Sequence, residues 1–294
     1  MPHPRSFRFG VQSGLPGATE PGAWAELARR VEALGYSSLS IPDHLTDQLA
    51  PIAAMTAAAA ATTSLKVGAL VFGNDYRHPV MLAKEIATID LLSGGRVEFG
   101  LGAGWMRTDY QQAAIPFDPP RVRIERMAEA LIVCRGLWGD GPFTFEGRHF
   151  RVTELDGRPK PVQRPHPPIL IGGGRPRVLA MAGRQADIVA DRVDEKIGWV
   201  RDAAGDRFDD LELNLLVQFA VVVDNRVELA ESMAPAVGLT AEQALDSPYA
   251  WVGTIGEICD DLERWRERWG ISYWVVHVDA MEALAPVVER LSGT

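Results

Sequence analysis

Short apolar runs alternate with segments of helical character along most of the chain, and this alternation predicts a repeated strand–helix unit. The runs that predict strands cover residues 7–12, 38–41, 66–71, 96–100, 168–171, 188–190, 213–223 and 273–278. Helices are predicted by apolar periodicity, alanine content and capping residues at 21–34, 51–62, 79–92, 121–138, 177–183, 195–204, 226–236, 240–245, 255–269 and 280–291.

Strands that alternate with helices favour a parallel sheet with right-handed crossovers. The predicted strands are almost uniformly apolar, as expected when helices cover a sheet. Eight such units within 294 residues predict a (β/α)8 TIM barrel, and their number disfavours the alternative of an open, doubly wound sheet. The rhythm stops at 139–167, where 143–145 and 149–152 predict a hairpin between units four and five. We expect one domain, 1–294, with this excursion.

Composition narrows the class of protein. Hydrophobic residues make up 47% of the chain, which excludes a disordered protein, and the net charge of −9 disfavours nucleic-acid binding. No apolar stretch approaches the ~20 residues that span a bilayer, and no secretory signal is expected, so we expect a cytoplasmic protein without membrane contact. Cys134 and Cys259 lack metal-ligand spacing, so neither a disulfide scaffold nor a cysteine-based zinc site is expected, and we predict no metal. Two arginine groups, at 121, 123 and 126 and at 175, 177 and 184, are candidates for a local cationic mouth that holds an anionic cofactor; the alternative is solvated arginines scattered on helices.

Chemistry in such a barrel lies at the carboxyl ends of the strands. Asp43 and His44 follow the second strand, where His44 is a candidate for proton transfer and Asp43 a candidate to orient it; the alternative is a pair that caps the next loop. Gly102 and Gly104 follow the fourth strand and permit close approach of a flat or anionic ligand. Their spacing does not fit a dinucleotide-binding fingerprint.

The fifth strand leads directly into Gly172, Gly173, Gly174 and Arg175, and a helix follows. Free backbone N–H groups at a helix start, together with an arginine, bind anions well. This pattern predicts a site for a phosphorylated, planar cofactor across the barrel mouth; the alternative is a glycine-rich turn without a ligand.

Four segments together resemble the bacterial luciferase-like monooxygenase superfamily. The central one reads TIDLLSGGRVEFGLGAGW over 88–105, preceded by NDYRHP at 74–79 and followed by PKPVQ at 159–163 and VGTIGEI at 252–258. The resemblance runs in consistent order over nearly the whole chain, and it is strongest to the actinobacterial F420-dependent branch. It implies a (β/α)8 oxidoreductase that uses coenzyme F420, a deazaflavin, or alternatively FMN.

The resemblance also implies roles for individual residues. His44 and Asp43 match the position beside the cofactor ring, and Ala69 and Leu70 match a bulge that carries a cis peptide bond. Asn74, together with the turn Gly102, Ala103 and Gly104, is implied to bind the cofactor. The loop Gly172, Gly173, Gly174 and Arg175 matches the phosphate site. Trp105 replaces the glutamate of the F420-dependent glucose-6-phosphate dehydrogenases, which argues against that sugar-phosphate chemistry.

Three functions therefore stand open. We expect F420-dependent hydride transfer to or from an organic substrate (an enone, imine or carbonyl), with His44 moving the proton. The alternative is FMN-dependent monooxygenation, with a separate flavin reductase as partner. A flavin-binding barrel without catalysis is the third. A homodimer acting on a small molecule is expected in either enzymatic case.

Overall fold

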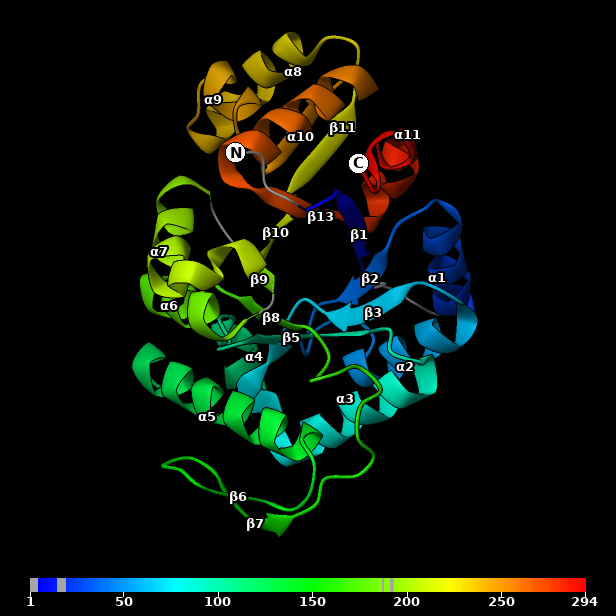
Figure 1. Cartoon of the computed structure of the whole chain (residues 1–294). Helices are drawn as coiled ribbons and strands as arrows, with labels where there is room; N and C mark the ends of the chain where they lie inside the picture. Colours follow the sequence, from blue (N-terminus) through cyan, green and yellow to red (C-terminus); the bar gives the residue numbers. More distant parts are fainter. Residues whose placement is uncertain (1–4, 15–19, 187, 191–192) are drawn as a thin grey trace.

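The computed structural model describes residues 5–14, 20–186, 188–190 and 193–294. Its parallel strands curl into a barrel in which each strand pairs with the next and β13 pairs with β1 (Figure 1). The predicted parallel α/β sheet is confirmed, and β2 has the predicted bounds. In order around the barrel, the strands are β1 (Arg8–Gln12), β2 (Ser38–Ile41), β3 (Lys66–Ala69), β5 (Val97–Gly102), β8 (Ile169–Gly172), β9 (Ile188–Ala190), β10 (Glu212–Leu216) and β13 (Ile271–His277), with the short β4 (Phe72–Gly73) beside β5.

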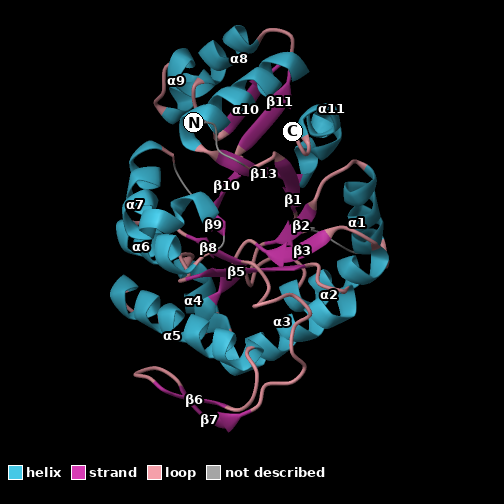
Figure 2. Cartoon of the chain, in the orientation of Figure 1, coloured by secondary structure: helices cyan, strands magenta, loops and turns pink. Residues whose placement is uncertain are grey.

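Helices surround these strands on the outside, as Figure 2 shows. Their apolar faces pack on the sheet and bury a large core that includes strand residues such as Phe9, Leu39 and Phe99. Within the described residues, no helix is both long and apolar enough to cross a membrane. The helices are α1 (Ala23–Ala33), α2 (Pro51–Ala61), α3 (Pro79–Ser93), α4 (Arg107–Gln112), α5 (Pro120–Trp138), α6 (Pro176–Gln185), α7 (Asp194–Ala204), α8 (Arg226–Met233), α9 (Ala241–Leu245), α10 (Ile255–Trp269) and α11 (Met281–Leu291).

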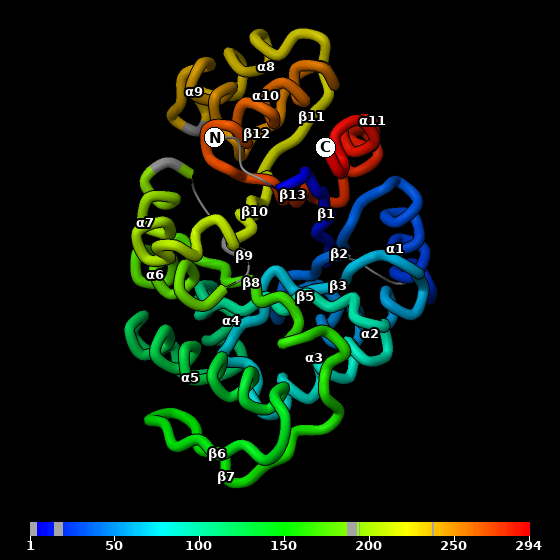
Figure 3. The backbone as a smooth tube through the Cα atoms, viewed as in Figure 1, coloured from blue at the N-terminus to red at the C-terminus, as the bar shows by residue number. Residues whose placement is uncertain are grey.

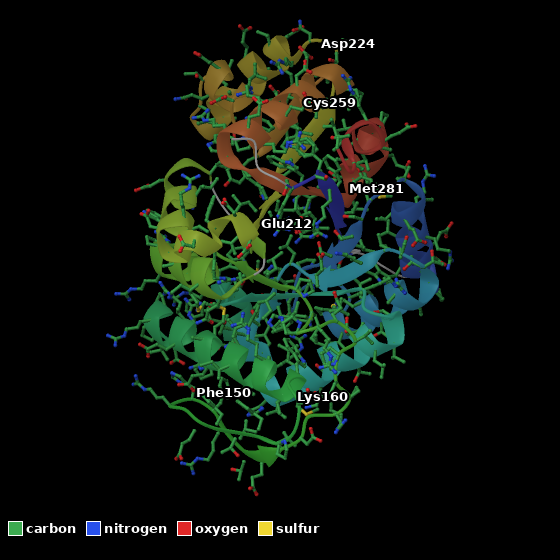
Figure 4. All side chains as sticks on the ribbon, viewed as in Figure 1. Phe150, Lys160, Glu212, Asp224, Cys259 and Met281 are labelled. Atoms are coloured by element: carbon green, nitrogen blue, oxygen red, sulfur yellow. The ribbon has the colours of Figure 1, made fainter. Side chains whose placement is uncertain are left out.

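A charged network fills the barrel near the start of its strands. Arg8 of β1 donates hydrogen bonds to Glu98 of β5 (2.6 Å) and to Glu212 of β10 (2.8 Å), and its guanidinium stacks on Tyr273. Figure 4 shows Glu212 toward the centre of the molecule. Burial raises the pKa of Glu98, but the charges of Arg8 and Lys66 outweigh it and hold that pKa below its usual value. The network therefore keeps a buried carboxylate ionised.

The region 139–167 forms the predicted hairpin, with β6 (Phe143–Glu146) antiparallel to β7 (Arg151–Leu155). It lies outside the barrel, on the far side of α5 (Figure 1), and Phe150 and Lys160 are on this side of the molecule (Figure 4). The Glu129 carboxylate of α5 accepts hydrogen bonds from the backbone N–H groups of 148–150, at 2.8–3.1 Å. Burial raises the pKa of Glu129, but these three bonds lower it below its usual value, so the turn is fixed to α5 by an ionised group.

The predicted strand 213–223 is wrong as a single element. The chain forms β10, and then β11 (Phe219–Val222) leaves the barrel and pairs with β12 (Ala250–Gly253), a strand that the sequence reading missed. The change of partner occurs at Gln218, because its N–H and that of Phe219 both donate to the Tyr249 carbonyl (2.9 and 3.1 Å) instead of to β13. Figure 3 shows the tube of β11 outside the barrel, beside β12 and α10.

The segment that leads into β8 is fixed by one buried side chain. Asp90 of α3 is fully buried and accepts hydrogen bonds from the backbone N–H groups of Val162 (2.7 Å) and Gln163 (3.0 Å). It also accepts one from Gln163 Nε2 (2.7 Å), which in turn donates to the Val97 carbonyl (2.8 Å). The PKPVQ segment therefore has a structural function: it connects α3 and β5 to the strand that precedes the glycine loop.

Candidate active site

A cavity of about 880 Å³ opens where the barrel strands end. This is the end at which a parallel α/β barrel carries its chemistry, and the volume lies in the range of small-molecule sites. The turns after β2, β3, β5, β8 and β10 all contribute. Those of its lining residues that the sequence predicted are Asp43, His44, Leu70, Gly102, Ala103, Gly104, Gly172, Gly173, Gly174 and Arg175.

His44 is held on one side of this cavity by a carboxylate distant in sequence. Its Nδ1 lies 2.8 Å from Oδ2 of Asp109, a fully buried residue of α4. The Tyr76 hydroxyl donates to the same oxygen at 3.2 Å. Burial and the charge of Asp109 raise the pKa of Tyr76 above its ordinary value, so this hydroxyl keeps its proton. Trp105, 72% exposed, meets the His44 ring edge-on with 5.6 Å between ring centroids.

Asp43 is engaged elsewhere, which corrects the expectation that it orients His44. Its buried carboxylate accepts hydrogen bonds from Arg77 Nη1 (2.5 Å), Arg77 Nη2 (3.1 Å) and the Gly73 N–H (2.9 Å). The side chains of two consecutive residues project in different directions. The Asp43 carboxylate therefore points to the loop 73–77, and the Asp109 carboxylate contacts His44 instead. Asp43 lines the cavity while it fixes the 73–77 loop.

A cis peptide bond joins Leu70 to Val71, one residue beyond the position that the resemblance implied. The Leu70 carbonyl accepts a hydrogen bond from Gln12 Nε2 at 2.8 Å. Leu70 and Val71 line the cavity. A Cβ at Gly102 would lie 2.6 Å from Val71 Cγ2, so this glycine makes room for the Leu70–Val71 segment. Close packing by the protein's own chain thus explains a glycine that the sequence reading assigned to the ligand.

The cationic mouth exists in part. Arg175 and Arg177 are exposed, line the cavity and flank the start of α6, whose N-cap has no side-chain hydrogen bond. Arg121 joins them from α5 and pairs with Glu125 of the same helix at 2.7 Å. Arg123 also lines the cavity, and its guanidinium donates to the carbonyls of Ala103, Gly104 and Asp118. The remaining two lie elsewhere: Arg126 pairs with Asp75 and Asp118, and Arg184 is in the last turn of α6.

Two predicted site residues lie away from this cavity. Ala69 borders a very small cavity inside the barrel, and Asn74, which is buried, borders a separate one of about 350 Å³ beside His78 and Phe150. The residue that the sequence reading missed is Asp109. The sequence offered no periodic signal for it, because α4 has only six residues.

The family model that matches is that of the luciferase-like monooxygenases, and it covers residues 6–269. The chain belongs to the luciferase-like monooxygenase family. The segments that carried the resemblance in the sequence, 74–79, 88–105, 159–163 and 252–258, all lie within the matched range.

Named relatives within this family differ in cofactor. The chain is 34% identical over 128 residues to an FMNH2-dependent dimethylsulfone monooxygenase of Pseudomonas putida, covering 44% of this chain and 35% of that protein. It is 30% identical over 201 residues to an F420-dependent hydroxymycolic acid dehydrogenase of Mycobacterium tuberculosis, covering 66% of this chain and 51% of that protein. The matches therefore span about a third to a half of these relatives' length.

The fold also matches a solved family structure along its whole length. This is the coenzyme F420-dependent tetrahydromethanopterin reductase of Methanopyrus kandleri, with a TM-score of 0.80 and 19% identity over 98% of this chain and 99% of that one. At this identity the likeness concerns the fold alone.

Proposed function

We propose that this chain is an F420-dependent oxidoreductase that transfers a hydride between the deazaflavin and an organic substrate such as an enone, imine or carbonyl. The observation that carries the proposal is the geometry of the cavity: His44, held by a buried carboxylate, lies at the same barrel mouth as the start of α6 with Arg175 and Arg177. A histidine suited to proton transfer and a helix start suited to a phosphate at one end of the barrel support this function.

The residues of the cavity fit such a cofactor. Leu70 and Val71 provide an apolar surface for a planar ring, and the 172–174 loop provides backbone for close approach of a phosphate. Arg175 and Arg177 add positive charge at the start of α6. The bound deazaflavin supplies two-electron hydride chemistry. The chain supplies the rest: it binds the anion, orients the ring, and holds a proton at His44.

The breadth of the sequence matches supports F420 over FMN. The F420-dependent relative matches 66% of this chain, and the FMNH2-dependent one 44%. FMN-dependent monooxygenation, with a flavin reductase as partner, is the second candidate, because the FMNH2-dependent relative has the higher identity over its shorter match.

We also propose a single domain over 1–294, with 139–167 as an insertion into the barrel, and a homodimer in solution.

Cofactor choice is tested by titrating the protein with F420 and, separately, with FMN while following the quenching of cofactor fluorescence. We expect saturable quenching of F420 and a much weaker response to FMN. Tight FMN binding without an F420 response overturns the choice of deazaflavin. Failure to bind either cofactor overturns the site.

Arg175→Ala tests the anion site within the same titration. One charge-assisted hydrogen bond contributes about 1.5–3 kcal/mol, reduced by exposure, so we expect affinity to fall roughly 5- to 30-fold. Arg184→Ala is the matched control, because Arg184 lies at the opposite end of the same helix, and it should leave affinity unchanged. Equal affinities for the two variants would remove the phosphate site from this loop.

A further inference from the structure

The His44 ring presents its two nitrogens to different surroundings. Nδ1 lies 2.8 Å from Oδ2 of Asp109, while the ring lines the cavity and its side chain is 22% exposed. Because the two nitrogens lie on opposite sides of an imidazole, contact of Nδ1 with Asp109 leaves Nε2 for a ligand in the cavity. Which nitrogen carries the proton in the neutral ring then decides whether Nε2 accepts or donates.

The surroundings of Asp109 suit a group that determines which nitrogen of His44 carries the hydrogen. It is fully buried, and it accepts a second hydrogen bond at Oδ2 from the Tyr76 hydroxyl, at 3.2 Å. Tyr76 keeps its proton, because burial and the charge of Asp109 raise its pKa. A carboxylate offers only acceptors, so the His44 nitrogen that faces it must carry a hydrogen.

We propose that Asp109, steadied by Tyr76, is a positioning residue that fixes the neutral His44 ring in the tautomer with its hydrogen on Nδ1 and its lone pair on Nε2. The inference rests on the proposed function, because that function assigns proton transfer to His44. When an alcohol is oxidised, its carbon gives up a hydride to the cofactor and its hydroxyl proton passes to Nε2, which leaves an imidazolium paired with Asp109. In the reverse direction the imidazolium returns that proton to the substrate oxygen.

The second oxygen of Asp109 makes the inference testable with a nearly isosteric variant. Among the described residues, Oδ1 is buried without a hydrogen-bond partner. In Asp109→Asn, an amide group at the Oδ1 position would leave its donors unsatisfied. At the Oδ2 position the same amide donates to Nδ1 of His44 and to the Tyr76 oxygen. The second arrangement is favoured, since buried donors need partners. It selects the tautomer with hydrogen on Nε2.

The tautomer is measured by long-range proton–nitrogen NMR on protein labelled with [15N]histidine, without cofactor, at a pH where the His44 ring is neutral. His44→Gln assigns the His44 signal among the six histidines. We expect the Nδ1–H pattern in the unmodified protein and the Nε2–H pattern in Asp109→Asn. Asp118→Asn, the same chemical change in the nearby loop, should retain the Nδ1–H pattern. An Nε2–H pattern in the unmodified protein, or no change in Asp109→Asn, overturns the proposal.

Turnover gives the second readout, with reduced F420 and cyclohexenone as the probe pair. We expect Asp109→Asn to lower kcat about 10- to 100-fold while F420 affinity and KM change little, because the variant alters a proton and not a binding surface. The same substitution in a His44→Gln background should have no further effect. Additive losses overturn the positioning role. The NMR result is independent of the cofactor titration, so failure of this inference and failure of the proposed function are distinguishable.

Discussion

Asp90→Asn is expected to destabilise the protein strongly, because the buried Asp90 carboxylate accepts three hydrogen bonds from Val162 and Gln163. An asparagine can keep one oxygen toward the two backbone N–H groups, but its amide then faces Nε2 of Gln163, so two donors meet. That nitrogen cannot turn away without losing its bond to the Val97 carbonyl.

The magnitude follows from these bonds. A hydrogen bond to a charged group contributes about 1.5–3 kcal/mol, and a neutral one about 0.5–1.5 kcal/mol. Losing one charged bond and converting two others to neutral ones lowers the free energy of unfolding by about 3.5–6 kcal/mol. The assay is equilibrium urea unfolding at neutral pH, read by tryptophan fluorescence.

Two comparisons make this result specific. Asp140→Asn is the matched control, since this side chain is 92% exposed and lies 3.8 Å from Arg164; we expect a change within about 0.5 kcal/mol. In a Gln163→Ala background, Asp90→Asn should cost less, because one of its bonds is already absent. A loss below about 1 kcal/mol for Asp90→Asn alone would refute the reasoning that this carboxylate holds the segment before β8.

Two other variants test charges outside the cavity. Burial raises the pKa of Glu32, but hydrogen bonds from three backbone N–H groups outweigh it and lower the pKa to about 2. The unfolded value is about 4.3, so this stabilisation is present at neutral pH and is lost as the pH falls toward 2. Glu32→Gln should therefore cost about 1 kcal/mol at pH 7, discounted for exposure, and little at pH 2, by urea unfolding at both pH values; an equal cost at both would contradict it. Arg8→Met removes the main partner of buried Glu98 and should cost about 3–5 kcal/mol in the same assay. Adding Glu98→Gln should recover part of that loss, and no recovery would show that the charge of Glu98 is not the cause.

The fold was predictable where each element is specified by its own residues. The strand at 38–41 appears with its predicted bounds, because the segment Ser-Leu-Ser-Ile ends at Pro42, which fixes the end of the strand. The run 213–223 is richer in apolar residues, yet it divides at Gln218 when the chain exchanges β13 for the segment at Tyr249. Periodicity reports which residues are buried. It does not report which strand they pair with.

The site residues that directly follow strands were predictable from the sequence. The contacts between residues that are distant in the sequence were not. His44 and the glycine loop follow strands directly, so their placement at the barrel mouth follows from topology alone. Asp109 is 65 residues from His44 and lies on a helix of six residues without a strong periodic signal. The sequence therefore suggested Asp43, the adjacent carboxylate. Only the packing of α4 against the turn after β2 shows which carboxylate contacts the histidine.

We propose F420-dependent hydride transfer in this cavity, with His44 as the proton-transfer group. The most direct test of this function is anaerobic oxidation of reduced F420 by cyclohexenone, followed by the return of oxidised deazaflavin absorbance. The parallel assay uses His44→Gln, with F420 affinity measured for both proteins. We predict turnover by the unmodified protein and a loss of about 100-fold or more in His44→Gln with F420 affinity retained. Turnover by His44→Gln at the unmodified rate would contradict the role of His44, and a protein that oxidises only reduced FMN, with oxygen, would contradict the deazaflavin chemistry.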